Sequence, residues 1–166
     1  MNFNFLENTW FAVNDTVMLG SSVGYVEKMD KMLKFYGKLS DHFFGGFASC
    51  QTQFEPGTFA GFDGIEMSVR GSENRNFQAR FYPVQTDMTM SYAKGSYIAN
   101  FKAKKDWTTV KIPFDSAEFF WRGRKVSKIP PIDPSQLKGI GFLISDKIFD
   151  SSFELFVESI SGYKNE

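Results

Sequence analysis

The chain has 166 residues, and its 19 lysines and arginines balance its 19 aspartates and glutamates. A chain without net charge presents no field that would attract a polyanion, so the composition argues against nucleic acid as a ligand. One cysteine excludes an internal disulfide, and no apolar run approaches the roughly 20 residues that a membrane-spanning helix needs.

Apolar and polar residues alternate along most of the chain, which is typical of strands with one face in a core. Phenylalanine is abundant, at 20 residues, and aromatic side chains pack well on a pleated surface. The predicted strands cover residues 9–13, 23–29, 32–36, 47–53, 65–70, 77–82, 88–92, 97–103, 107–112, 140–145 and 153–158. Turn residues separate them at intervals typical of a sandwich. The sequence therefore predicts an all-β fold in a single domain over residues 1–166.

Helix is expected only as short turns. Asp115 followed by Glu118 matches a capping box, in which the aspartate accepts a backbone N–H and the glutamate reaches back. Asp133 followed by Pro134 matches the start of a second turn, because proline is preorganised for the first helical position. The proline-rich stretch 125–134 is expected to be a surface loop that joins two strands of one sandwich.

A G-x-S-x-G pattern at residues 20–24 matches the nucleophile elbow of hydrolases, but that motif needs a helix after it. Here a predicted strand follows, and the one histidine, His42, lies too close in the sequence with no acid correctly placed. His42 and Cys50 could also act together as a base and a thiol nucleophile. We interpret His42 as a turn residue and Cys50 as a small strand residue, so we expect no catalytic residue and no enzymatic activity.

Asp146, Asp150 and Glu154 could offer oxygen ligands to calcium, but their spacing is not that of a calcium-binding loop. Asp150 followed by two serines is typical of a hairpin turn. A transition-metal site would need three or four histidine, cysteine or carboxylate ligands, and no nucleotide-binding glycine motif is present. We therefore interpret the three acids as part of a solvated turn and expect no metal and no cofactor.

Several motifs occur in an order that is found in a known family. In chain order they are VNDTVMLG (13–20), GGFAS (45–49), WTTVKIPF (107–114), IGFLISDK (140–147) and FELFVESI (153–160). Together they extend over nearly the whole chain and resemble the complex I intermediate-associated protein 30 family. One departure follows the GGFAS motif, where Gln51 stands in place of an arginine that relatives usually carry.

The resemblance implies a jelly-roll β-sandwich of the galactose-binding-domain-like type. Mitochondrial relatives act as assembly chaperones for NADH:ubiquinone oxidoreductase, so the resemblance implies a non-enzymatic assembly factor or interaction module. Its partner would be a protein, such as an intermediate of a respiratory or other membrane complex. Carbohydrate or small-ligand binding on the concave sheet face is the alternative. Because the first residues lack the basic start and apolar stretch of a signal peptide, a cytoplasmic location is expected.

Six residues are candidates for contact with the partner or ligand: Asn14, Asp15, Arg70, Arg80, Trp121 and Arg122. Tryptophan and arginine often contribute much of the energy of an interface, and Tyr82 or Tyr92 could add an aromatic surface. The side chains of Asn14 and Asp15 have two interpretations. They either bond backbone N–H groups within a turn, or they join Arg70 or Arg80 at an exposed polar site.

Overall fold

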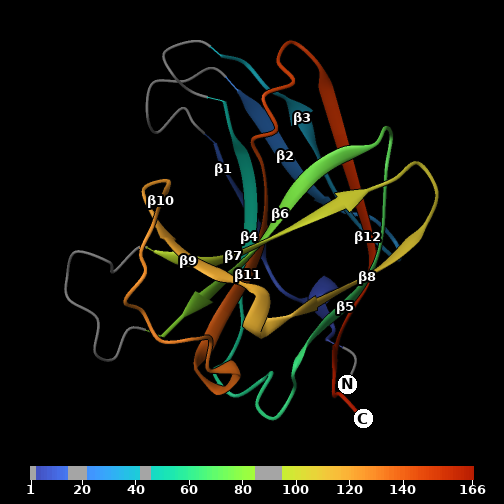
Figure 1. Cartoon of the computed structure of the whole chain (residues 1–166). Helices are drawn as coiled ribbons and strands as arrows, with labels where there is room; N and C mark the ends of the chain where they lie inside the picture. Colours follow the sequence, from blue (N-terminus) through green and yellow to red (C-terminus); the bar gives the residue numbers. More distant parts are fainter. Residues whose placement is uncertain (1–2, 15–21, 42–45, 85–94) are drawn as a thin grey trace.

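The computed structural model describes residues 3–14, 22–41, 46–84 and 95–166, which form two antiparallel sheets packed face to face (Figure 1). The larger sheet has the strand order β1-β4-β11-β6-β7-β9-β10, and the smaller sheet has the order β2-β3-β12-β5-β8. The last two strands of the described chain, β11 and β12, lie inside the sheets and not at their edges. The predicted all-β, jelly-roll sandwich is confirmed.

The bounds of the elements are as follows. The larger sheet contains β1 (Trp10–Asn14), β4 (Ala48–Gln53), β11 (Leu137–Ile144), β6 (Arg75–Pro83), β7 (Ser96–Ala103), β9 (Glu118–Trp121) and β10 (Arg124–Lys125). The smaller sheet contains β2 (Val23–Lys28), β3 (Leu33–Lys38), β12 (Ser152–Tyr163), β5 (Gly64–Gly71) and β8 (Thr108–Pro113). The described part also contains the 3-10 helices η1 (Phe5–Glu7), η5 (Phe114–Ser116) and η6 (Pro134–Gln136).

Each predicted strand that falls on described residues has a counterpart in the structure, and the predicted strand 88–92 lies outside those residues. The predicted turn at Pro134 is confirmed as η6, where the Asp133 carboxylate accepts a hydrogen bond from the backbone N–H of Ser135 at 3.0 Å. The loop before it joins β10 to β11 of the same sheet, as expected.

The predicted capping box at Asp115 is wrong. Asp115 lies inside η5, which begins at Phe114 and has no side-chain cap. Glu118 is instead the first residue of β9, where it pairs with Ile98 of β7. The expected short helical turn does form, as η5, but Glu118 belongs to the following strand and does not cap the turn. The sequence predicted neither β9 nor β10.

Aromatic rings fill much of the space between the two sheets. Phe35 of β3 and Phe77 of β6 face each other from opposite sheets, with ring centroids 6.5 Å apart. Phe153 packs on Phe35 at 5.0 Å, and Phe101 stacks on Phe77 at 5.9 Å. All four side chains are buried. The high phenylalanine content thus supplies the core, with the edge-to-face and offset geometries that aromatic pairs prefer.

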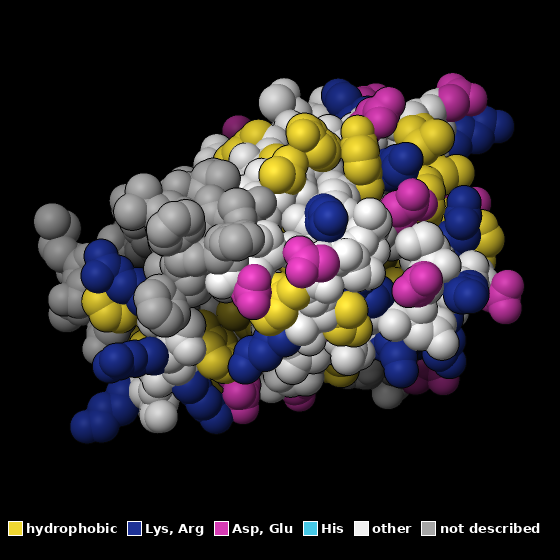
Figure 2. All heavy atoms as spheres, turned by 90° about the horizontal axis from the view of Figure 1, so that it is seen from above, with side chains coloured by type: hydrophobic (Ala, Val, Ile, Leu, Met, Phe, Trp, Pro, Cys, Tyr) yellow, Lys and Arg dark blue, Asp and Glu magenta, His cyan; other side chains and the backbone are white. Residues whose placement is uncertain are grey.

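The surface mixes charges of both signs. At the end of the molecule shown in Figure 2, lysine and arginine side chains are interspersed with aspartate and glutamate, and hydrophobic side chains lie between them. Exposed large hydrophobic side chains include Val23 and Tyr25 on β2. No helix among the described residues has the length and apolar character needed to cross a lipid bilayer.

Candidate functional site

The outward face of the seven-stranded sheet is hollowed along its middle strands. Strand pairing places Gln51 of β4, Gly141 of β11 and Arg80 of β6 side by side. Two hollows meet at Arg80, one of about 400 Å³ toward β4 and one of about 710 Å³ toward β9. We call these two hollows together the central groove. Its lining includes Phe47, Gln51, Gln53, Gln78, Arg80, Tyr82, Ile98, Phe120, Arg122, Lys138 and Gly139.

Two glycines of β11 lie along the central groove: Gly139 lines it, and Gly141 lies between Gln51 and Arg80. A Cβ atom at Gly141 would lie 2.4 Å from the carbonyl oxygen of Cys50, and one at Gly139 would lie 2.9 Å from the carbonyl oxygen of Thr52. Neither position has room for a side chain without movement of the neighbouring backbone. The backbone of β11 therefore stays bare between the outward side chains of β4 and β6, which deepens the groove.

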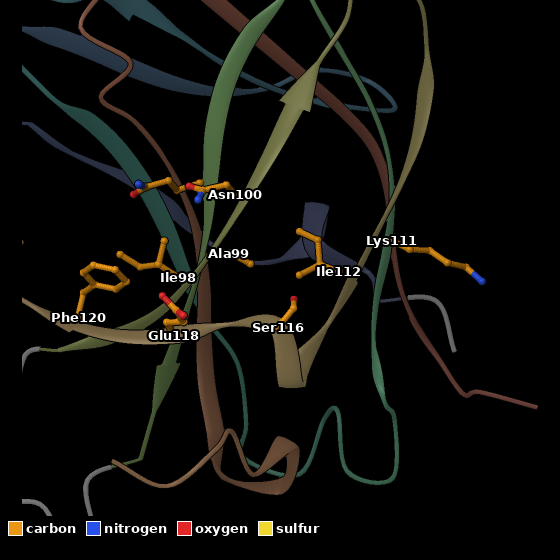
Figure 3. Close-up of a pocket in the computed structure, with 9 residues that line it drawn as sticks. Ile98, Ala99, Asn100, Lys111, Ile112, Ser116, Glu118 and Phe120 are labelled. Atoms are coloured by element: carbon orange, nitrogen blue, oxygen red, sulfur yellow. The ribbon is translucent and has the colours of Figure 1, made fainter. Parts of the chain in front are cut away.

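A third hollow, of about 440 Å³, extends the central groove toward β8 and shares Gln78, Ile98 and Phe120 with it. Figure 3 shows Ile98 and Phe120 close together on β7 and β9, whereas Lys111 extends away from them. The central groove crosses β4, β11, β6, β7 and β9. Neighbouring strands are about 4.8 Å apart, so this path is roughly 20 Å long, which suits an extended chain and not only a small molecule.

Arg80 and Tyr82 lie together where the two hollows of the groove meet. The Nε–H of Arg80 donates to the buried hydroxyl of Ser96 at 3.1 Å, and the guanidinium carbon lies 5.5 Å from the centroid of the Tyr82 ring. The hydroxyl of Tyr82 is buried and has no partner among the described residues. Burial raises the pKa of Tyr82, and the opposing effect of nearby Arg80 is smaller. The hydroxyl therefore stays protonated near neutral pH.

Two of the candidates named from the sequence line the same hollow. Arg80 reaches it from β6, and Arg122 reaches it from the turn between β9 and β10. The guanidinium carbon of Arg122 lies 4.8 Å from the ring of Trp121, and Trp121 packs partly buried against the core. The Trp121 ring thus packs against the guanidinium of Arg122, and the Trp121 side chain is only partly exposed to solvent.

Arg70 and Asn14 lie elsewhere. Arg70 is on the outward face of the smaller sheet, with its guanidinium carbon 4.2 Å from the ring of Phe156, so the structure does not bring it together with Arg80. Asn14 ends β1, and its Nδ2 donates to the carbonyl of Gly24 at 3.1 Å, a bond between two neighbouring strands. Its Oδ1 is buried without a partner in the described part of the chain. Asp15 lies outside the described residues, as does Tyr92.

Sequence reasoning missed the amide side chains that surround Arg80 and Tyr82. Gln51 and Gln53 come from β4, and Gln78 comes from β6. The signal was present in part, because Gln78 is a polar position between the buried Phe77 and Ala79. Alternation shows that such a side chain points outward, but it does not show that the surface is hollow there.

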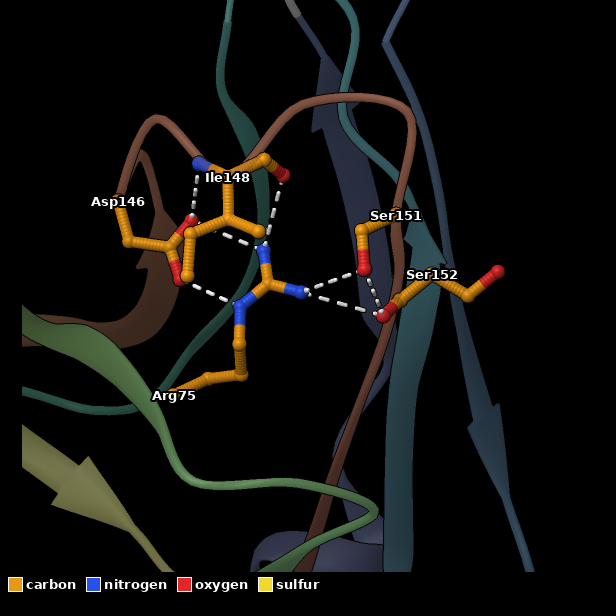
Figure 4. A network of polar contacts seen from close by, with 5 residues as sticks. All are labelled: Arg75, Asp146, Ile148, Ser151 and Ser152. Carbon is orange, nitrogen blue, oxygen red and sulfur yellow. Dashed lines mark hydrogen bonds and ion pairs between the residues drawn. The ribbon is translucent and has the colours of Figure 1, made fainter.

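The sequence also missed the partner of Asp146. This side chain is 4% exposed and makes a two-pronged ion pair with Arg75, whose Nη2 lies 2.9 Å from Oδ1 (Figure 4). Arg75 also donates to the carbonyls of Ile148 and Ser152. The prediction of a solvated turn is therefore wrong for Asp146, because the ion pair removes it from water. Asp150 has a positive φ of 56°, which suits a turn.

Cys50 is a buried strand residue, as its surroundings in the sequence suggested. Burial raises the pKa of its thiol well above the usual range, so the group stays un-ionised and is a poor nucleophile. His42, its proposed partner in a thiol mechanism, lies outside the described residues.

Chelators are expected to leave the fold intact. Within the described ranges, no group of three or more histidine, cysteine or carboxylate residues is placed to hold a metal ion. Since a structural metal contributes its binding energy to folding, its removal would lower the melting temperature. We expect equal melting temperatures with and without EDTA in a thermal scan. A fall in EDTA that calcium restores would contradict this expectation.

Comparisons of the sequence with known proteins agree with the motifs. The family model for complex I intermediate-associated protein 30 matches residues 3–157. An uncharacterized protein of the yeast Schizosaccharomyces pombe, C9E9.15, is 29% identical over 172 aligned positions, which cover 95% of this chain and 78% of the yeast protein.

Comparisons of the structure point to carbohydrate-binding modules of the same fold. A family 11 module from Clostridium thermocellum, solved with a β-1,3-1,4-mixed-linked tetrasaccharide, has a TM-score of 0.72 at 11% identity, covering 99% of this chain and 96% of the module. A family 30 module from the same organism has a TM-score of 0.62 at 12% identity, covering 95% of this chain and 94% of the module. At such low identity these similarities show the fold alone.

Proposed function

The chain belongs to the complex I intermediate-associated protein 30 family, and on that premise we propose that it is a non-enzymatic binding module that holds a partner protein during assembly of a multisubunit complex. The central groove is its binding surface. The observation that carries this proposal is the pair of hollows that meet at Arg80 and cross five strands of the larger sheet. A concave surface with a few polar groups among apolar ones is the usual form of a binding site.

The shape and chemistry of the central groove suit an extended polypeptide segment. Gly139 lines it from β11, and the amides of Gln51, Gln53 and Gln78 also line it. Each amide can donate to and accept from a peptide unit of the partner. Ile98 and Phe120 add an apolar surface at one end of the groove. Such a mixture of polar and apolar contacts is typical of interfaces that form and separate again.

The test is affinity capture from the native cell with chemical crosslinking. We expect the wild-type protein to retain subunits of one multisubunit complex, with complex I as the first candidate, and we expect Gln78→Tyr to lose them because the larger side chain fills the groove. Ser68→Tyr is the matched control, since Ser68 is a half-buried position on β5 of the other sheet. Equal capture by Gln78→Tyr and wild type would place the binding surface elsewhere.

Carbohydrate is the second candidate ligand. The observation in its favour is the presence of amides beside aromatic rings, since Gln53 lines the same hollow as Tyr82, and Gln78 lines the same hollow as Phe120. Amides can bond sugar hydroxyls, and rings can pack on the apolar faces of sugars. Native gels with soluble mixed-linked β-1,3-1,4-glucan test this candidate. Retardation of wild type but not of Gln78→Tyr, without any captured protein, would favour the sugar over the partner protein.

A further inference from the structure

The central groove is positively charged, although the whole chain is neutral. Arg80, Arg122 and Lys138 line its two hollows, and no described aspartate or glutamate does. None of these three cations takes part in an ion pair within the described ranges. Of the nearby acids, Glu118 is paired with Lys125 at 2.9 Å, and Asp146 is paired with Arg75. Among the described residues, these positive charges of the groove therefore have no paired counter-charge.

The guanidinium of Arg80 is held in place for a ligand. The residue is half-buried, and its Nε–H is fixed by the buried hydroxyl of Ser96. Its Nη groups have no hydrogen-bond partner among the described residues. Arginine cannot lose its proton in a protein, so partial burial of its charge is unfavourable unless an anion approaches. A carboxylate suits the planar guanidinium best, because it accepts two parallel hydrogen bonds.

The backbone conformation of its turn does not explain why residue 122 is an arginine. Arg122 and Gly123 both have positive φ angles, 49° and 75°, and they connect β9 to β10 as a two-residue hairpin turn. Asparagine, aspartate or glycine is preferred at such a position, because a left-handed backbone is unfavourable for other residues. Residues in unfavourable backbone conformations are often found where a ligand is held. An arginine thus occupies a position that the turn disfavours, and it lines the hollow that Arg80 also lines.

We propose that Arg80 and Arg122, which line the same hollow, form an anion site in the central groove, and that it binds the carboxylate of an acidic side chain in an extended segment of the partner protein. The inference rests on the proposed function and adds the chemistry of the partner. The partner segment lies across the strands over Gly139 and Gly141, with glutamate or aspartate at the meeting point of the two hollows.

The experiment measures fluorescence anisotropy with a fluorescein-labelled peptide of alternating glutamate and glycine. We expect wild type to bind this peptide, more weakly as salt is added, and to bind the glutamine counterpart at least about tenfold more weakly. Arg80→Gln and Arg122→Asn should each weaken binding by about tenfold or more. Lys34→Gln, which removes one positive charge from the outward face of β3, should leave the affinity unchanged.

Arg122→Asn also separates a binding role from a structural one. Because asparagine suits the turn better than arginine, this variant should melt at the same temperature as wild type or higher, while its affinity for the peptide falls. An unchanged affinity in Arg122→Asn, no binding of the glutamate peptide, or equal binding of the glutamine peptide would overturn the anion site. Tighter binding of polygalacturonate than of the peptide would overturn the assignment to a protein segment.

Failure of this inference can be told apart from failure of the proposed function. If Arg122→Asn captures the same complex subunits as wild type and the peptide does not bind, the anion site is wrong and the assembly role stands. If wild type captures no complex but binds the peptide through Arg80 and Arg122, the assembly role is wrong and the anion site stands.

Discussion

Replacing Arg75 with leucine is expected to lower the free energy of unfolding by about 3–5 kcal/mol, because Asp146 would be left buried without its counter-charge. The side chains of the two residues are only 3% and 4% exposed, so water cannot take the place of the guanidinium. Arg75→Leu also removes the hydrogen bonds that tie β6 to the carbonyls of Ile148 and Ser152. Urea denaturation measures the free energy of unfolding. The slope of this free energy against urea concentration is compared between the variants.

Two further variants make this result specific to the buried pair. Leucine at both position 75 and position 146 should recover part of the lost stability, since no buried charge then remains unpaired. Lys125→Ala breaks the exposed pair with Glu118, in which both side chains are 52% exposed, and should cost less than about 1 kcal/mol. A loss below that value for Arg75→Leu would show that the ion pair does not stabilise the fold.

Replacing Phe142 with alanine is expected to lower the free energy of unfolding by about 3–5 kcal/mol. Phe142 is fully buried on β11, with its ring parallel to Trp10 of β1 at 5.9 Å and edge-on to Phe101 of β7 at 6.1 Å. Its removal opens a cavity between strands that are not neighbours in the sheet, so the backbone cannot close it by a small shift.

Phe11→Ala is the matched control for Phe142→Ala. Phe11 lies on β1 beside Trp10 but faces outward and is 40% exposed. Its removal should change stability by about 0.5 kcal/mol or less. Urea denaturation of both variants checks the difference. Equal losses for Phe11→Ala and Phe142→Ala would mean that the aromatic contacts of the core contribute little to stability.

Most strands could be predicted because their side chains alternate. Residues 77–82 of β6 show the pattern clearly, with Phe77, Ala79 and Phe81 buried. Strand β9 has no such pattern, since Phe119, Phe120 and Trp121 are consecutive aromatic residues. Its four residues are also too few for a period of two to be recognised. Pairing with β7 and β10 specifies this segment as a strand, and the pairing with β7 is not local.

The candidate site was predictable only in part, for a related reason. Arg70 and Arg80 both occupy polar positions of alternating strands, and the sequence offers no means of telling them apart. They lie on β5 and β6, which follow each other along the chain but belong to different sheets. Asp146 and Arg75 are 71 positions apart, so no short-range pattern could join them. Which sheet face is hollow depends on the order of the strands in the sheet. The alternation of polar and apolar side chains along the sequence gives no information on that order.

The interior positions of β11 and β12 have a consequence for synthesis on the ribosome. β11 separates β4 from β6, and β12 separates β3 from β5, so each sheet remains in two pieces until residues 137–163 have emerged. Until then the nascent chain exposes four unpaired strand edges, which are prone to aggregation. The sheets can therefore be completed only after residue 163 has emerged, and they form through long-range contacts, which makes folding slow. A deletion of residues 137–163 would remove an interior strand from each sheet, so we expect the remaining residues not to fold.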